Sequence, residues 1–129
     1  MKEILKSHHP MRRAQSFKYA FEGLFHALLH EANFQIQVFI VLISTTMGFY
    51  FKISNTEWGM LALSMGFLLS AEMINTVIEE FIDHLITRES PAAKLIKDLG
   101  AGFVLVASFA TLFILILIFG GRISELLIR

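Results

Sequence analysis

Four polar residues recur along one stretch of the chain at spacings that place them on one side of a helix. They are Glu72, Asn75, Glu79 and Asp83, separated by three, four and four residues. At about 100° per residue they lie at roughly 0°, −60°, −20° and +20° around the helix axis. Three carboxylates and an amide on one face could accept a substrate proton or bind a hard cation through oxygen. The alternative is a polar network that fixes the register of neighbouring helices.

A second cluster of charged residues supplies the opposite charge. Lys94, Lys97 and Asp98 lie within about one helical turn of one another. Two ammonium groups beside carboxylates could bind phosphate oxygens, and Asp98 could join a metal site or orient a lysine. The alternative is a solvated ion pair that anchors the positive side of a membrane protein.

Other residues that could do chemistry fit known motifs poorly. His26 and His30 are followed by Glu31, which is not the His-Glu-x-x-His order of a zinc-binding helix. The chain contains no Gly-x-x-x-x-Gly-Lys-Ser/Thr loop and no His-Arg-Asp motif. A P-loop nucleotide site and a protein-kinase catalytic loop are therefore excluded.

The composition is that of a membrane protein. Of the 129 residues, 55% are hydrophobic and 17% are charged; there is no cysteine and the net charge is zero. This balance excludes a disulfide-linked scaffold and a basic nucleic-acid-binding surface. Residues 32–51, 58–71 and 99–121 form runs without Asp, Glu, Lys or Arg. A membrane-spanning helix needs about 20 mostly apolar residues, so the first and third runs are long enough alone.

The sequence predicts one all-α integral-membrane domain over residues 1–129. We expect a surface helix over about residues 14–32 and membrane spans over about residues 33–52, 56–86 and 91–120. The second span continues its apolar pattern past Glu72, so its last turns leave the bilayer. Because three helices cannot easily surround a polar site, we also expect a homo-oligomer.

Helix start and stop signals agree with these spans. Residues 54–57 have the Ser-x-x-Glu form of a capping box, which predicts the start of the second span. Ser90 followed by Pro91 predicts the start of the third. Gly120 and Gly121 are expected to end it.

The predicted surface helix divides into two faces. Such a helix lies flat at the membrane interface as an anchor, and a lid over a nearby site is compatible with that role. The apolar residues are Phe17, Phe21, Leu24, Phe25 and Leu28, and the polar ones are Lys18, Glu22, His26 and His30.

Small residues occur at spacings that would let helices approach closely. We expect such packing at Gly100, Ala101 and Gly102, and at Ala62, Gly66 and Ser70.

The distribution of Lys and Arg predicts how the chain is oriented in the membrane. Eight of the eleven Lys and Arg residues precede the first span or lie between the second and third, which predicts that both segments are cytoplasmic.

Glu72 follows Glu57 by fifteen residues, or about 22 Å, so it lies just inside the cytoplasmic boundary. A shielded carboxylate there could accept a proton from a lipid hydroxyl. Glu79, farther out, could hold Mg²⁺, and Glu31 could join it.

Three blocks of the sequence together resemble the small integral-membrane bacterial diacylglycerol kinase and undecaprenol kinase family. They are residues 72–83, residues 93–105 and the segment Glu31-Ala-Asn-Phe, and the likeness extends over about residues 12–119. The resemblance implies a homotrimer in the bacterial cytoplasmic membrane. It also implies transfer of the γ-phosphate of ATP to a lipid alcohol, with Mg²⁺ as cofactor.

The resemblance also implies roles for individual residues. Glu72 corresponds to the family's general base, with Asn75 beside it, and Glu31 and Glu79 correspond to its metal ligands. Glu72 and Lys94 are expected to bind the lipid substrate. The residues expected to contact ATP are Arg12, Tyr19, Glu79, Asp83, Lys97 and Asp98.

The two branches of this family differ in their lipid substrate, and residues near the first and second spans bear on which one applies. Residues 33–35, 51–54 and 57–58 look more like the undecaprenol branch, whereas Ala32 and Gln37 depart from it. We therefore favour undecaprenol over diacylglycerol. Two readings from other classes are a small proton-coupled transporter that uses Glu72 and a membrane scaffold without catalysis.

Overall fold

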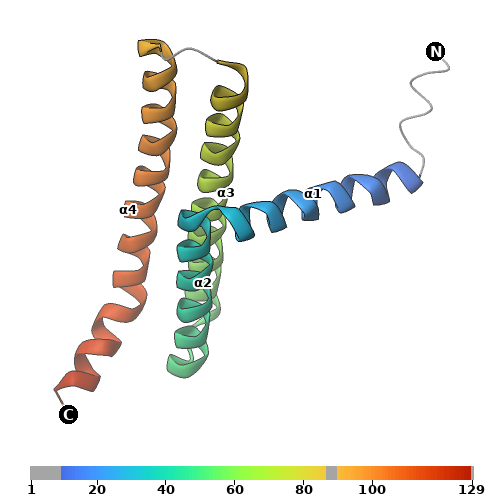
Figure 1. Cartoon of the computed structure of the whole chain (residues 1–129). Coiled ribbons are helices and arrows are strands. Elements are labelled where there is room, and N and C mark those ends of the chain that lie inside the picture. The colour runs from blue at the N-terminus through green and yellow to red at the C-terminus, as the bar shows by residue number, and fades with distance from the viewer. Residues whose placement is uncertain (1–9, 87–89, 129) are drawn as a thin grey trace.

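The computed structural model describes residues 10–86 and 90–128 and contains four helices there. These are α1 (Pro10–His30), α2 (Ala32–Phe51), α3 (Asn55–Leu85) and α4 (Pro91–Leu127). Figure 1 shows α2, α3 and α4 running up and down beside one another, while α1 projects sideways from them. The three upright helices are long and apolar enough to cross a membrane. The predicted all-α fold with three candidate spans is confirmed, and the homotrimer stays a prediction.

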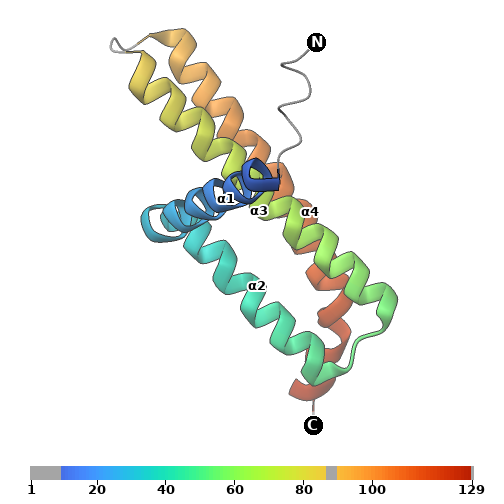
Figure 2. The same ribbon diagram turned by 90° about the vertical axis from the view of Figure 1, so that its right-hand side faces the viewer.

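The last two helices are longer than a bilayer is thick. The 31 residues of α3 and the 37 residues of α4 extend about 46 Å and 55 Å, against about 30 Å of hydrocarbon. Figure 2 shows that both continue past α1 as a pair of helices without α2 beside them. We call this pair the α3–α4 arm (residues 79–86 and 90–98).

The predicted helix starts are confirmed by their capping bonds. The Ser54 amide donates to Glu57 Oε2 at 2.8 Å, and the Glu57 amide donates to Ser54 Oγ at 3.3 Å. The Ala93 amide donates to Ser90 Oγ at 3.0 Å, with proline next to the cap. At Glu31 the backbone becomes extended, which ends α1 and begins α2. The first helix therefore covers residues 10–30, compared with the expected 14–32.

The predicted helix end at Gly120 and Gly121 is wrong, because α4 continues to Leu127. Neither glycine adopts the positive φ that would end a helix. Arg122, one residue later, donates from Nη1 to Glu57 Oε1 at 2.8 Å and from Nη2 to Glu57 Oε2 at 3.1 Å. This paired contact joins α4 to the start of α3 and stabilises a continuous helix.

Two clusters of buried side chains hold the upright helices together. One lies near the α2–α3 turn, and the other, smaller cluster joins the middle of α3 to α4 through Leu68, Ala71 and Ala107. Ala107 has no exposed surface, and nearby Thr111 Oγ1 donates to the Ser64 carbonyl at 3.1 Å. The residues of the first cluster are Ile53, Leu61, Met65, Ile118 and Phe119.

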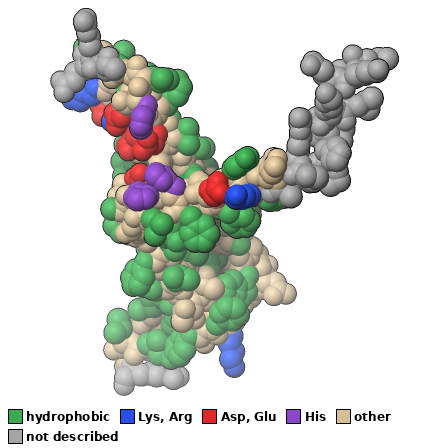
Figure 3. Space-filling model, turned by 45° about the vertical axis from the view of Figure 1, so that its right-hand side comes forward, with side chains coloured by type: hydrophobic (Ala, Val, Ile, Leu, Met, Phe, Trp, Pro, Cys, Tyr) green, Lys and Arg blue, Asp and Glu red, His purple; other side chains and the backbone are tan. Residues whose placement is uncertain are grey.

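Much apolar surface remains exposed in the single chain. Figure 3 shows hydrophobic side chains over the surface below α1, and acidic and histidine side chains where α1 meets the bundle and above it. Ala62, Gly66 and Ser70 are exposed, so close packing through them stays a prediction for contacts between chains. Phe17 and Phe25 of α1 are 70% and 60% exposed, and the role of α1 at a membrane surface also stays a prediction.

Candidate functional site

The carboxylate of Glu72 is buried and paired with a side chain from α2. Glu72 is 2% exposed and Gln37 is 7% exposed. Gln37 Nε2 donates to Glu72 Oε2 at 2.7 Å, which links α2 to the middle of α3. From the sequence, Gln37 stands out only as a departure from a family pattern. Its spacing of four residues from Asn33 was the available signal, because both side chains fall on one face of α2.

One turn along α3, a second amide and a second carboxylate are joined. Asn75 is 6% exposed, and its Nδ2 donates to Glu79 Oε1 at 3.0 Å. The other amide atom, Oδ1, is buried and has no hydrogen-bond partner. A Cβ at Gly100 would stand 2.5 Å from this Oδ1, so α4 approaches α3 closely here. The predicted close packing is therefore confirmed at Gly100, whereas a Cβ at Gly102 would meet nothing within 4 Å and Ala101 is exposed.

The cationic cluster meets the acidic face in the α3–α4 arm. Lys97 Nζ donates to both oxygens of Asp83, at 2.8 and 2.9 Å. The Lys97 side chain is 35% exposed and that of Asp83 is 62% exposed, so the pair is open to solutes. Lys94 and Asp98 are exposed on the same helix. On the predicted polar face of α3, Glu72 therefore contacts α2, whereas Asn75 and Asp83 contact α4.

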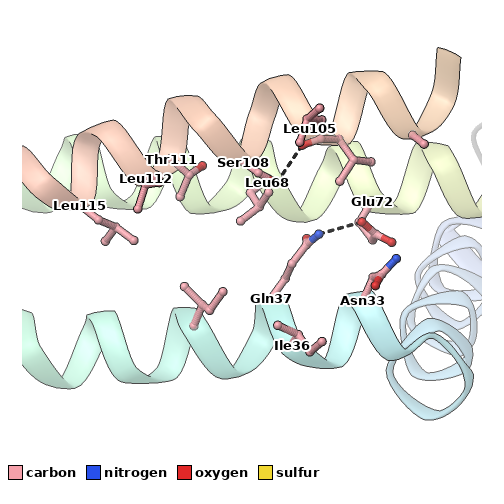
Figure 4. A pocket seen from close by; sticks show the side chains of 13 residues that line it. Asn33, Ile36, Gln37, Leu68, Glu72, Leu105, Ser108, Thr111, Leu112 and Leu115 are labelled. Atoms are coloured by element: carbon pink, nitrogen blue, oxygen red, sulfur yellow. Dashed lines mark hydrogen bonds between the residues drawn. The ribbon is translucent and has the colours of Figure 1, made fainter. Parts of the chain in front are cut away.

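A groove runs along the bundle beside the buried carboxylate. It has a volume of about 400 Å³ and is lined by all three upright helices. Figure 4 shows Glu72, Gln37 and Asn33 at the end near α1, with Leu112 and Leu115 toward the opposite end. The groove is therefore polar at one end and mainly apolar along its length.

The expected metal ligands lie on different helices. Glu79 is half-buried on α3, and Glu31 is half-buried at the start of α2, where its side chain makes no capping bond. Within residues 10–86 and 90–128, no three His, Asp or Glu side chains gather as a ready-made metal site. Mg²⁺ is commonly held by one or two carboxylates together with substrate phosphates. Glu79 and Glu31 offer carboxylate oxygens, the donor type that this mode uses, and their binding of Mg²⁺ stays a prediction.

The remaining expected ATP contacts lie in α1. Tyr19 is 64% exposed. Arg12 belongs to α1, but its side chain is outside the described part of the structure. Of the expected site residues, hydrogen bonds join Asn75 to Glu79 and Asp83 to Lys97, while Glu72 is paired with Gln37 of α2. Within the described residues, no side-chain hydrogen bond joins these pairs to Glu31, Tyr19, Lys94 or Asp98.

Comparison with known proteins assigns the chain to a family. The model of the prokaryotic diacylglycerol kinase family matches residues 18–119. Undecaprenol kinase from Bacillus subtilis is 33% identical over 105 residues, covering 81% of this chain and 85% of that protein. Diacylglycerol kinase from Synechocystis is 29% identical over 100 residues, covering 77% of this chain and 57% of that protein. The chain therefore belongs to the prokaryotic diacylglycerol kinase family, a family of lipid kinases.

Proposed function

We propose that the protein transfers the γ-phosphate of ATP to the hydroxyl group of a membrane lipid alcohol. The observation that carries this proposal is the position of Glu72, buried at the polar end of a mainly apolar groove. A lipid alcohol has the same division, with one reactive hydroxyl at the end of long hydrocarbon chains. Family membership supports the kinase reaction independently of this geometry.

The groove fits the lipid better than it fits the nucleotide. Most of its lining side chains are aliphatic, including Ile36, Leu105 and Leu112. Because lipid tails are as apolar as these side chains, a hydrocarbon chain would be held in the groove by packing contacts. Glu72 and Gln37 supply polar side chains near α1. Farther along the groove, the hydroxyls of Ser108 and Thr111 donate to backbone carbonyls. A lipid chain lying along the groove would therefore bring its hydroxyl to Glu72.

Glu72 acts as the general base in this proposal. Oε2 is held by Gln37, which leaves Oε1 to take the proton of the lipid hydroxyl. The hydroxyl oxygen then forms a bond to the γ-phosphorus, and the bond from that phosphorus to the bridging oxygen of ADP breaks. Products are the lipid phosphate and ADP, with the proton on Glu72. Positioning and electrostatic stabilisation supply most of the acceleration in phosphoryl transfer.

The nucleotide binds at the polar side chains outside the groove. Glu79 and Glu31 would hold Mg²⁺, which when bound neutralises phosphate charge. Asn75 fixes the carboxylate of Glu79 through its 3.0 Å hydrogen bond. Lys97, which is bonded to Asp83 in the structure, would turn toward the phosphates and supply a positive charge beside them. The same proposal includes contacts to ATP from Arg12, Tyr19, Asp83 and Asp98. It also includes a contact to the lipid from Lys94.

The arrangement in the membrane is also part of the proposal. The charged α3–α4 arm and the N-terminus lie on the cytoplasmic side of the inner membrane, where ATP is found. The apolar side of α1 rests on the membrane surface. The exposed apolar faces of α2, α3 and α4 assemble three chains into a homotrimer, which would bring further side chains around the site.

Undecaprenol is the lipid alcohol that we favour. The Bacillus subtilis relative is named an undecaprenol kinase, and it aligns over 85% of its own length. The relative named a diacylglycerol kinase aligns over 57% of its length and is less similar.

A transfer assay with the two lipids in parallel tests this choice. Purified protein in bilayers is supplied with ATP labelled on the γ-phosphate, Mg²⁺, and either undecaprenol or diacylglycerol, with EDTA as a control. We expect preferential labelling of undecaprenol that EDTA abolishes. Preferential labelling of diacylglycerol would reassign the substrate. Proton flux without ATP and without lipid labelling would contradict the kinase assignment.

A further inference from the structure

The amide of Gln37 is placed to control the orientation of Glu72. Both side chains are more than nine-tenths buried, and 2.7 Å separates Gln37 Nε2 from Glu72 Oε2. No other hydrogen bond to the Glu72 side chain occurs within the described residues. The carboxylate of Glu72 therefore takes its orientation from a residue on a different helix.

The opposite atom of the same amide is not used by the fold. Gln37 Oε1 is buried and has no hydrogen-bond partner. Burying a polar atom without a partner is unfavourable, so packing alone gives no reason for glutamine at this position. Gln37 also lines the groove in which we place the lipid. What the structure does show for this amide is the bond from its nitrogen to Glu72 Oε2.

The chemistry of an amide suits a base that changes its protonation state. An amide can donate through nitrogen to a carboxylate or accept through oxygen from a carboxylic acid. It carries no charge, so it orients Glu72 without compensating the negative charge that attracts the proton. A lysine or arginine at this position would hold the carboxylate in its charged form.

We propose that Gln37 is a positioning residue that aims Glu72 Oε1 at the lipid hydroxyl. The inference rests on the proposed lipid kinase activity and deepens it. Its amide nitrogen holds Oε2 before transfer, which leaves Oε1 for the hydroxyl. Gln37 thereby acts on the rate of transfer through Glu72 and leaves ATP binding unchanged.

The test compares two substitutions at Gln37 with a matched control. Gln37→Met keeps the length and removes the amide, whereas Gln37→Asn keeps the amide but shortens its reach. Gln35→Met makes the same change two residues away, on an exposed side chain whose contact is with the Leu29 carbonyl. Initial rates are measured at varied ATP and varied lipid, and circular dichroism and gel filtration compare the folded state.

Both Gln37 variants are expected to lower kcat by about tenfold or more, with the KM for ATP unchanged and Gln35→Met active. Combining Gln37→Met with Glu72→Gln should give no loss beyond that of Glu72→Gln alone, because both act on one group. Gln37 variants with kcat within about twofold of the parent would overturn the inference, as would losses that multiply. A parent protein that labels no lipid would instead overturn the proposed function. Because Gln37→Asn retains polarity, it keeps the test usable if Gln37→Met does not fold.

Discussion

Gly100 and Asn75 are in contact across the interface of α3 and α4, and the space beside Gly100 is taken by the amide of Asn75. A Cβ added at Gly100 would stand 2.5 Å from Asn75 Oδ1. The same amide donates to Glu79, a proposed metal ligand, at 3.0 Å. The absence of a side chain on α4 therefore determines where a functional carboxylate on α3 is held.

Replacing Gly100 by alanine should damage activity more than stability. The added methyl group displaces the Asn75 side chain and breaks its bond to Glu79. The lost hydrogen bond costs about 0.5–1.5 kcal/mol, and the better helix propensity of alanine returns up to about 1 kcal/mol. We expect kcat to fall about tenfold or more with a nearly unchanged unfolding midpoint.

The control for this substitution is Gly102→Ala. It makes the same change two residues away, where an added Cβ meets nothing within 4 Å. Equal activity of the two variants in the transfer assay would show that Asn75 does not depend on Gly100.

Glu79→Ala should change the dependence of activity on Mg²⁺. The substitution removes one of the two carboxylates that we assign to the ion, while Asn75 loses only a partner on its own helix. We expect activity to be abolished or to require about tenfold more Mg²⁺. The next residue, Glu80, is exposed and lies beside His84, so Glu80→Ala serves as the control. An unchanged Mg²⁺ titration of Glu79→Ala would refute the ligand role.

Lys97→Met should weaken ATP binding without unfolding the protein. The pair of Lys97 and Asp83 is partly exposed, with its closest atoms 2.8 Å apart. Exposed ion pairs contribute little to stability. We expect the KM for ATP to rise about tenfold or more, because a charge that contacts phosphate is lost. Thermal unfolding measured alongside should hardly change; a large drop in the midpoint with a normal KM would indicate a structural role for Lys97.

Filling the groove should impair use of the lipid and spare ATP. Ser108 lines the groove and donates a hydrogen bond only within α4, to the Val104 carbonyl at 2.8 Å. Ser108→Phe places an aromatic ring in a space of about 400 Å³. We expect the KM for the lipid to rise about fivefold or more, and the KM for ATP to stay constant. Ala110→Phe, on an exposed part of α4 outside the groove, is the comparison; equal lipid KM values would place the lipid elsewhere.

The helices and their starts could be predicted from local patterns. Two long runs without charged residues, and a shorter run whose apolar pattern continues past Glu72, predicted the three candidate spans. The Ser54 and Ser90 caps act over three residues within the chain. The helix end at Gly120 and Gly121 could not be predicted in this way. There the pairing of Arg122 with Glu57, 65 residues apart, favours a continuous helix over the local preference of glycine.

The candidate site was predictable only where it follows one helix. The shared face of Glu72, Asn75 and Glu79 follows from helical spacing. The pairing of Gln37 with Glu72, 35 residues apart in the sequence, depends on how α2 packs on α3. Helical periodicity fixes the directions of side chains around one axis, but it does not fix which faces of two helices meet. It could therefore not predict the contact between Gln37 and Glu72.

The central claim is that Glu72 removes the proton of a lipid hydroxyl during phosphate transfer from ATP. The most direct measurement compares the parent protein with Glu72→Gln in the labelled-ATP assay, with undecaprenol and diacylglycerol as acceptors. Glutamine keeps the size of the side chain but cannot take the proton. We predict that the parent labels lipid and that Glu72→Gln, with unchanged helix content and assembly, is slower by about 10²-fold or more. Full activity of Glu72→Gln would contradict the account.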